Sequence, residues 1–171
     1  MAKVWTDIPD GSIQSGEALK TGLMTDYRDN DEANSVKPVY IPIDENKPAA
    51  PVAYPGTADA TYYAYCPEDA KALTVRAGLW GSAGTSYCKI RVSKMSGAAG
   101  NIEVENSTTA TSKGSPGGSS DKTYSFTGLN NVSGDDLRGQ EIKLELFFKS
   151  SAGGTIDIEC LNWPQSRFAV S

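Results

Sequence analysis

Carboxylates are the side chains of this sequence that could carry acid–base chemistry, because the chain contains no histidine. Without histidine there is no Ser-His-Asp triad, no Cys-His nucleophile pair and none of the common zinc sites. The remaining candidates for a catalytic dyad are acidic pairs, which are Glu68 with Asp69, Glu103 with Glu105, and Asp135 with Asp136. Such pairs are solvated far more often than they are catalytic, so the sequence predicts a protein that is not an enzyme.

The motifs that bind metals and cofactors are also missing. The acidic run Asp26, Asp29, Asn30, Asp31 and Glu32 could suggest calcium, but it lacks the alternating ligands and the central glycine of an EF-hand loop. A solvated helix end is the better interpretation of this run. No glycine-rich phosphate loop leads into a helix. We therefore expect neither a metal nor a cofactor.

The charge and hydropathy of the chain exclude two classes of partner. The net charge is −5 and the sequence has no basic cluster that could neutralise phosphates, which argues against nucleic-acid binding. No stretch approaches the roughly 18 consecutive apolar residues of a membrane span, and the polar start lacks the regions of a signal peptide. We expect a protein that is made and used in soluble form, with no membrane as a partner.

Two groups of aromatic residues could instead stack on sugar rings. Tyr62, Tyr63 and Tyr65 lie close together in the sequence, and Trp80, Tyr87 and Trp163 could share one sheet edge. The alternative, which we favour, is that these aromatic side chains lie in the core or in a subunit interface, where such residues are enriched. A host-surface glycan therefore remains a possible ligand.

The three cysteines, Cys66, Cys88 and Cys160, cannot all pair within one chain, and none belongs to a C-x-x-C unit. We expect three reduced cysteines packed as small apolar residues, as in a protein made in a reducing cytoplasm. A disulfide bridge between subunits is the alternative.

Residues 1–35 form an acidic segment with spaced apolar side chains. They contain three Lys or Arg against seven Asp or Glu, whereas the other 136 residues contain 13 against 14. An extended arm followed by a helix over residues 16–29, with Ser15 as its N-cap, would present one apolar stripe. The stripe packs either on the chain's own domain or on another protein, and we favour docking on a partner. The expected docking residues are Trp5, Ile8, Ile13, Leu19, Leu23, Met24, Tyr27 and Arg28.

Residues 36–58 hold five of the nine prolines and predict an extended linker. Such a segment could also lie along a sheet edge. From residue 59 to residue 171, apolar and polar residues alternate with period two over residues 73–79, 88–92, 142–148 and 156–160, with weaker strands near 60–65, 101–105, 124–127 and 167–170. We expect an all-β domain, an antiparallel β-sandwich of jelly-roll type, in which residues 142–160 form the clearest hairpin.

The N-terminal residues resemble a recurrent opening of tailed-phage virion proteins. The matching elements are Ile8-Pro-Asp-Gly, Ser15-Gly16, Leu23-Met24, Arg28-Asp29-Asn30 and Ala33, which together cover about a sixth of the chain. Tyr27 departs from the pattern, which more often has an aliphatic residue there. In that family such an N-terminus is an attachment segment, and a β-rich domain follows it on the outside of the particle.

The resemblance implies a virion protein, made in the host cytoplasm, that docks on the major capsid protein or on another virion protein. Because the chain carries one sandwich and no fibre repeats, we expect a capsid decoration (cement) or short head-fibre protein that forms a homotrimer. A tail-associated adaptor or fibre protein and a host-glycan-binding module are the alternatives.

Overall fold

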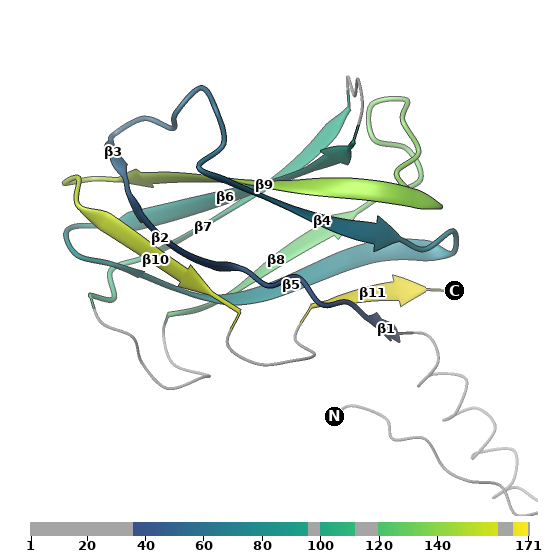
Figure 1. The fold of residues 1–171 in the computed structure, drawn as a ribbon, viewed down its shortest axis with the longest axis horizontal. Helices are drawn as coiled ribbons and strands as arrows, with labels where there is room; N and C mark the ends of the chain where they lie inside the picture. Colours follow the sequence, from purple (N-terminus) through teal and green to yellow (C-terminus); the bar gives the residue numbers. More distant parts are fainter. Residues whose placement is uncertain (1–35, 96–99, 112–119, 161–165, 171) are drawn as a thin grey trace, which may run out of the picture.

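The computed structural model describes residues 36–95, 100–111, 120–160 and 166–170, and the regular elements of this part of the chain are all β-strands (Figure 1). The docking residues expected between Trp5 and Arg28, the helix expected over residues 16–29, and Trp163 lie outside the described residues. The strands are β1 (Val36–Pro38), β2 (Asp44–Pro48), β3 (Ala50–Pro51), β4 (Ala60–Cys66), β5 (Ala70–Gly81), β6 (Ser86–Lys94), β7 (Asn101–Thr108), β8 (Asp121–Thr127), β9 (Gln140–Ser150), β10 (Thr155–Glu159) and β11 (Arg167–Val170).

The strands form two sheets that lie face to face, as Figure 1 shows. We call the first the β5 sheet. In it, β8 pairs with one side of β5, while β11 and β10 pair with successive parts of the other side. At the edge of this sheet, β1 pairs with β11 and β2 pairs with β10. In the second, the β9 sheet, β6 separates β9 from β7, and β4 and β3 pair end to end along the other side of β9. Each sheet therefore has four rows of strands.

The pairing of these eight rows is nested along the chain. In chain order the rows are β1 with β2, β3 with β4, then β5, β6, β7, β8, β9, and finally β10 with β11. The first row pairs with the last, the second with the seventh, the third with the sixth and the fourth with the fifth. A long hairpin rolled up in this way is a jelly roll, which confirms the expected β-sandwich.

The core lies between the sheets and follows from the period-two pattern. Every second residue of each long strand points inward, so Leu73, Val75 and Leu79 of β5 face Ile90 and Leu144 of the β9 sheet, and all are fully buried. The largest wholly buried side chains are aromatic: Tyr124, Phe126, Phe148 and Phe168. These rings pack in one core cluster with the aliphatic side chains of both sheets.

The hairpin expected over residues 142–160 is wrong. β9 pairs with β3, β4 and β6, whereas β10 pairs with β2 and β5, so the connection between β9 and β10 crosses from one sheet to the other. Gly153 and Gly154 take positive φ angles in this crossing, as a tight turn requires. Alternation reveals which face of a strand is buried, but it does not reveal which strand is its neighbour.

Residues 36–51 are part of the sandwich rather than a free linker. They supply β1 and β2 at one edge of the β5 sheet and β3 beside β9, and Ile41, Ile43 and Ala49 between these strands are buried in the core. Proline is tolerated at sheet edges because the ladder there lacks a partner on one side. This segment therefore lies along the sheet edges, and the sandwich begins at Val36 instead of residue 59.

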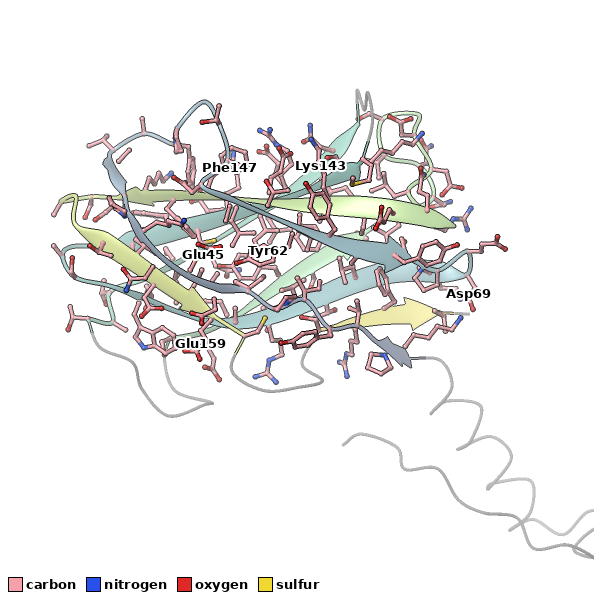
Figure 2. The ribbon with its side chains drawn as sticks, viewed as in Figure 1. Glu45, Tyr62, Asp69, Lys143, Phe147 and Glu159 are labelled. Atoms are coloured by element: carbon pink, nitrogen blue, oxygen red, sulfur yellow. The ribbon has the colours of Figure 1, made fainter. Side chains whose placement is uncertain are left out.

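Two side chains connect the sheets where the sandwich is open. On one side, the Tyr62 hydroxyl of β4 donates a 2.5 Å hydrogen bond to Glu45 of β2, and the two residues lie close together between the layers in Figure 2. On the opposite side, Asn106 of β7 donates to the carbonyl of Thr123 in β8 at 3.0 Å. Both open sides are thus fixed by direct hydrogen bonds.

Candidate interaction surface

Trp80 and Tyr87, two of the three aromatic residues expected to share a sheet edge, do not meet. Trp80 belongs to β5 and points away from the core on the outer face of the β5 sheet, whereas Tyr87 belongs to β6 and lies on the outer face of the β9 sheet. The connection between β5 and β6 crosses between the sheets, which separates the two residues despite their short distance in sequence. A sugar site built from Trp80 and Tyr87 together is therefore excluded.

Trp80 has a structural role in the β5 sheet. Its ring lies flat on Gly78, where a Cβ atom would come within 2.1 Å of the ring, and the side chain is only 2% exposed. Asp157 of β10 is its cross-strand neighbour. A ring that is covered to this degree offers no free face for stacking on a ligand.

The outer face of the β9 sheet carries a larger group of aromatic and charged side chains. β6 contributes Tyr87, Lys89 and Arg91, β7 contributes Glu103 and Glu105, and β9 contributes Phe147 and Lys149, all placed by the register on the side away from the core. The loop between β3 and β4, residues 52–59, rises over this part of the sheet in Figure 1. We call it the covering loop.

Tyr54 attaches the covering loop to the sheet. Its hydroxyl donates a 2.6 Å hydrogen bond to Glu105 of β7, and its ring lies 4.3 Å from the Lys149 ammonium and 4.8 Å from that of Lys89. Burial and the bond to Glu105 both raise the pKa of Tyr54, so the hydroxyl remains a donor. One side chain thus spans the sheet from β9 to β7.

Phe147 is buried on the outer face of the same sheet. It is 2% exposed although it points away from the core, and Figure 2 shows it on the outer side of β9. The Lys89 ammonium and the Arg91 guanidinium lie 5.0 Å and 4.6 Å from its ring. Glu103 is shared by these two cations and accepts from Arg91 at 2.7 Å and from Lys89 at 3.1 Å.

Glu103 remains ionised because of these two partners. Burial favours its neutral form, but the hydrogen bonds from Arg91 and Lys89 outweigh that effect and lower the pKa of the carboxyl below its ordinary value. Tyr54, Tyr87, Lys89, Phe147 and Lys149 occupy one part of this outer face, which we call the covered half. In this part, Phe147 is buried outside the core that lies between the sheets.

The covering loop begins with a strained residue. Val52 has a φ of 68°, a left-handed conformation that is rare for a β-branched side chain, and its amide donates to the Ser150 carbonyl at 3.0 Å. The side chain is 80% exposed and borders a pocket of about 240 Å³ that Tyr87, Lys149, Ser150 and Ser151 also line. The backbone strain is therefore located where the loop leaves β3, beside the end of β9.

No loop among the described residues covers the other half of the same face. Tyr63 and Tyr65 of β4 are 53% and 59% exposed, and Met95 at the end of β6 is 45% exposed. Lys143 and Glu141 of β9 are the cross-strand neighbours of Tyr63 and Tyr65. We call the part of the face formed by Tyr63, Tyr65 and Met95 the open half, and its aromatic rings are accessible to a partner.

Sequence reasoning missed Tyr54, Lys89, Phe147 and Lys149. One local signal was available, because Phe147 and Phe148 are adjacent in a period-two strand, so one of the two rings must point away from the core. Nothing in the sequence near Tyr54 indicates that it reaches Glu105, which lies 51 positions away.

Each acidic pair that could form a catalytic dyad has at least one carboxylate in an ion pair with a neighbouring cation. Asp69 binds Lys37 at 2.8 Å, Asp135 binds Lys94 at 2.5 Å, and Asp136 binds Arg138 at 2.8 Å. The hydrogen bonds from these cations lower the pKa of each of the three carboxyls, that of Asp136 to about 2.

The three cysteines are free thiols in the single chain. Cys66 and Cys88 are buried, and burial raises the pKa of the first to about 11 and of the second to about 12. Burial also raises the pKa of Cys160, which is partly exposed. All three thiols are therefore protonated near neutral pH, which makes them poor nucleophiles.

Two further properties concern only the described part of the chain. Within residues 36–95, 100–111, 120–160 and 166–170, no three His, Cys, Asp or Glu side chains gather as a metal site would require. The same residues contain no helix long and apolar enough to cross a membrane.

Comparison with known proteins gives weak structural likenesses. No protein-family model matches the chain, and no curated protein matches it. A crystal structure of the enzymatically active domain of tailspike protein 4 of bacteriophage CBA120 is similar over 80% of this chain and 19% of its own, with 13% identity and a TM-score of 0.35. A structure of infectious bursal disease virus, Gt strain, is similar over 80% of this chain and 36% of its own, with 13% identity and a TM-score of 0.36. The chain thus spans well under half the length of either.

Proposed function

We propose that the chain is a structural protein of a tailed-phage particle and that it decorates the capsid exterior as a cement or short head-fibre protein. Residues 1–35 bind the major capsid protein or another virion protein, and the jelly roll stands on the outside. A tail-associated adaptor or fibre protein is the alternative position in the particle. In either position the chain acts by binding rather than by catalysis.

The observation that carries this proposal is how the described core is composed. Within the described residues its side chains run from Ile41 to Val170, and they form one cluster between the two sheets of the jelly roll. The chain enters the sandwich through β1, an edge strand that pairs with β11 and is held by the ion pair between Lys37 and Asp69. Residues 1–35 directly precede β1 in the sequence, so they are connected to an edge strand of the jelly roll, which suits a docking segment.

The sequence of the first 35 residues supports the same assignment. Their excess of four negative charges and their spaced apolar side chains fit a basic, partly apolar surface, and their resemblance to phage attachment segments favours a virion protein as the partner. The jelly roll itself is a common architecture of viral capsid domains, although it also occurs in lectins.

The proposal is tested by changing the apolar stripe in the full-length chain. Replacing Leu19 and Leu23 by Glu places two charges on the stripe, whereas Thr21→Glu adds a charge at a position off the stripe and serves as the control. We expect the double variant to lose co-sedimentation with capsids assembled from the major capsid protein of the same phage, while the control still binds. Equal binding by both variants, at equal far-ultraviolet circular dichroism, would contradict a role of the stripe in docking.

A glycan-binding role now depends on a different pair of residues. The covered ring of Trp80 removes that residue as a stacking platform, but the exposure of Tyr63 and Tyr65 keeps two aromatic faces accessible. A glycan array probed with the full chain and with a variant carrying Tyr63→Ala and Tyr65→Ala tests this alternative. Binding that both proteins share, or no binding at all, would exclude the pair as a sugar site.

A further inference from the structure

The four edges of the two sheets differ in how they are protected against pairing with other strands. An exposed edge presents unpaired backbone groups, and proteins usually block such edges with charged residues, proline or short strands. β1 and β2 are short and contain Lys37, Pro38, Asp44 and Pro48 among others, and β7 carries Glu103 and Glu105. β8 begins with Asp121 and Lys122. These three edges therefore follow the usual rule.

β4 does not follow this rule. Its seven residues, Ala60–Cys66, include no charged residue and no proline, and its register with β9 is continuous over the whole strand, without a bulge. Among the described residues no other strand pairs with its outer side, as its position in Figure 1 shows. β4 is thus a long, regular and uncharged edge next to two exposed tyrosines, which is the composition of a strand that receives a partner strand.

The sequence of β4 fits a second copy of itself. If two β4 strands pair antiparallel about Ala64, each Tyr63 lies opposite the partner's Tyr65, and cross-strand aromatic pairs of this kind stabilise a sheet. Lys143 is the cross-strand neighbour of Tyr63, and Glu141 is that of Tyr65. Each line of side chains across the two copies would then run from Lys143 through Tyr63 to the second copy's Tyr65 and Glu141, with one positive and one negative end. A register centred on Tyr63 would instead place Lys143 at both ends of the central row, which favours the register centred on Ala64.

We propose that β4 pairs with β4 of a second copy about a twofold axis, and that this joins two β9 sheets into one continuous sheet of eight rows. The open half forms the aromatic part of this interface, and the uncharged edge lets the two copies approach without like-charge repulsion. This pairing goes beyond the proposed attachment through residues 1–35 and differs from the trimer that the resemblance implies. The two associations have different masses and use different residues.

The test measures the mass of the full-length protein by light scattering and sedimentation over a concentration series. We expect the wild-type chain to be a dimer at high concentration, and Tyr63→Lys to raise the dimer dissociation constant by about tenfold or more, because it removes both aromatic cross-strand pairs and adds a positive charge beside Lys143 in each copy. Tyr40→Lys is the matched control, since Tyr40 is 65% exposed and lies outside β4. A wild-type chain that is monomeric at all concentrations would overturn the pairing, as would a trimer or a dimer that Tyr63→Lys leaves unchanged.

Hydrogen exchange on the wild-type chain provides a measurement that does not depend on how any variant folds. The amides of residues 61–65 should exchange at least tenfold more slowly at high than at low protein concentration, while those of the other edge strand of the sheet, β7, should not change. Concentration-independent exchange in β4 would overturn the proposal. Because neither measurement involves capsids, failure of the dimer leaves the docking role of residues 1–35 to its own test.

Discussion

The covered and open halves of the β9 sheet carry similar side chains on the same face, yet they differ in what holds them. In the covered half, the loop of residues 52–59 brings Tyr54 over Lys89 and Lys149 and leaves Phe147 2% exposed. In the open half, Tyr63 and Tyr65 remain more than half exposed, with no described loop above them. Aromatic residues on an outer face therefore stabilise the fold where a loop covers them, and they are available for binding where none does.

The strongest test of this comparison is removal of the ring beneath the loop. Phe147→Ala should lower the free energy of unfolding by about 3 kcal/mol, because it leaves a cavity under Lys89 and Arg91. Tyr63→Ala, one of the exposed rings, should change it by less than about 0.5 kcal/mol. Urea denaturation of both variants, at a concentration where light scattering finds monomers, gives the two values. Similar losses would mean that the two halves do not differ in this respect.

A smaller effect should follow from the hydrogen bond that fastens the loop. Tyr54→Phe keeps the ring but removes the donor to Glu105, so we expect a loss of about 1 kcal/mol in the free energy of unfolding. A double-mutant cycle with Glu105→Gln measures the coupling between the two side chains. If the losses in the free energy of unfolding caused by the two substitutions are simply additive, the hydrogen bond does not hold the loop. Tyr65→Phe in the open half is the control, because it removes a hydroxyl that is not coupled to Glu105.

The strain at the start of the loop predicts a variant that is more stable than the natural chain. Val52→Gly relieves the positive φ, and after allowance for the greater freedom of glycine in the unfolded chain we expect a gain of about 1 kcal/mol. Ala53→Gly, at a neighbouring exposed position whose φ is not positive, should instead lower stability slightly. Thermal unfolding followed by calorimetry compares the two, and a loss in both would show that the conformation of Val52 carries no strain.

The pH dependence of the covered half should be the weakest of these effects. The pKa of Glu103 is lowered in the folded chain, so its contribution to stability is complete above the ordinary carboxyl pKa and is lost as the pH falls through the lowered value. Glu103→Gln should therefore be less stable than the natural chain at pH 7 and equally stable at pH 2. Urea midpoints at the two pH values measure this, and a difference that persists in acid would contradict the assignment of the ion pairs.

The sequence predicts the strands and the sandwich well, because alternation such as Leu73, Val75, Ala77 and Leu79 directly reflects burial on one face. It does not predict pairing between strands, and for this reason β9 and β10 were assigned to one hairpin although they belong to different sheets. The prolines of residues 36–58 were interpreted as a linker, whereas the buried Ile41 and Ile43 within the same segment hold it on the sandwich.

The candidate surface was harder to predict than the fold. Tyr87 was singled out from the sequence, but its partners Lys149 and Tyr54 come from distant parts of the chain. Trp80 was singled out for the wrong environment, since the absence of a side chain at Gly78 is what allows its ring to lie flat on the sheet. In both cases the deciding contact is tertiary, and no local pattern encodes it.

The nested order of strands also determines when the molecule can be completed during its synthesis. β1 has β11 as its ladder partner, so a strand from the beginning of the sandwich must wait until almost all of the remaining chain has left the ribosome. Folds dominated by contacts between distant residues form slowly, on the scale of milliseconds to seconds. Until β11 has been synthesised, β1 has no ladder partner, and the first 35 residues are connected to an unpaired strand. We therefore expect the nascent chain to present this segment for docking only after synthesis of the sandwich is finished.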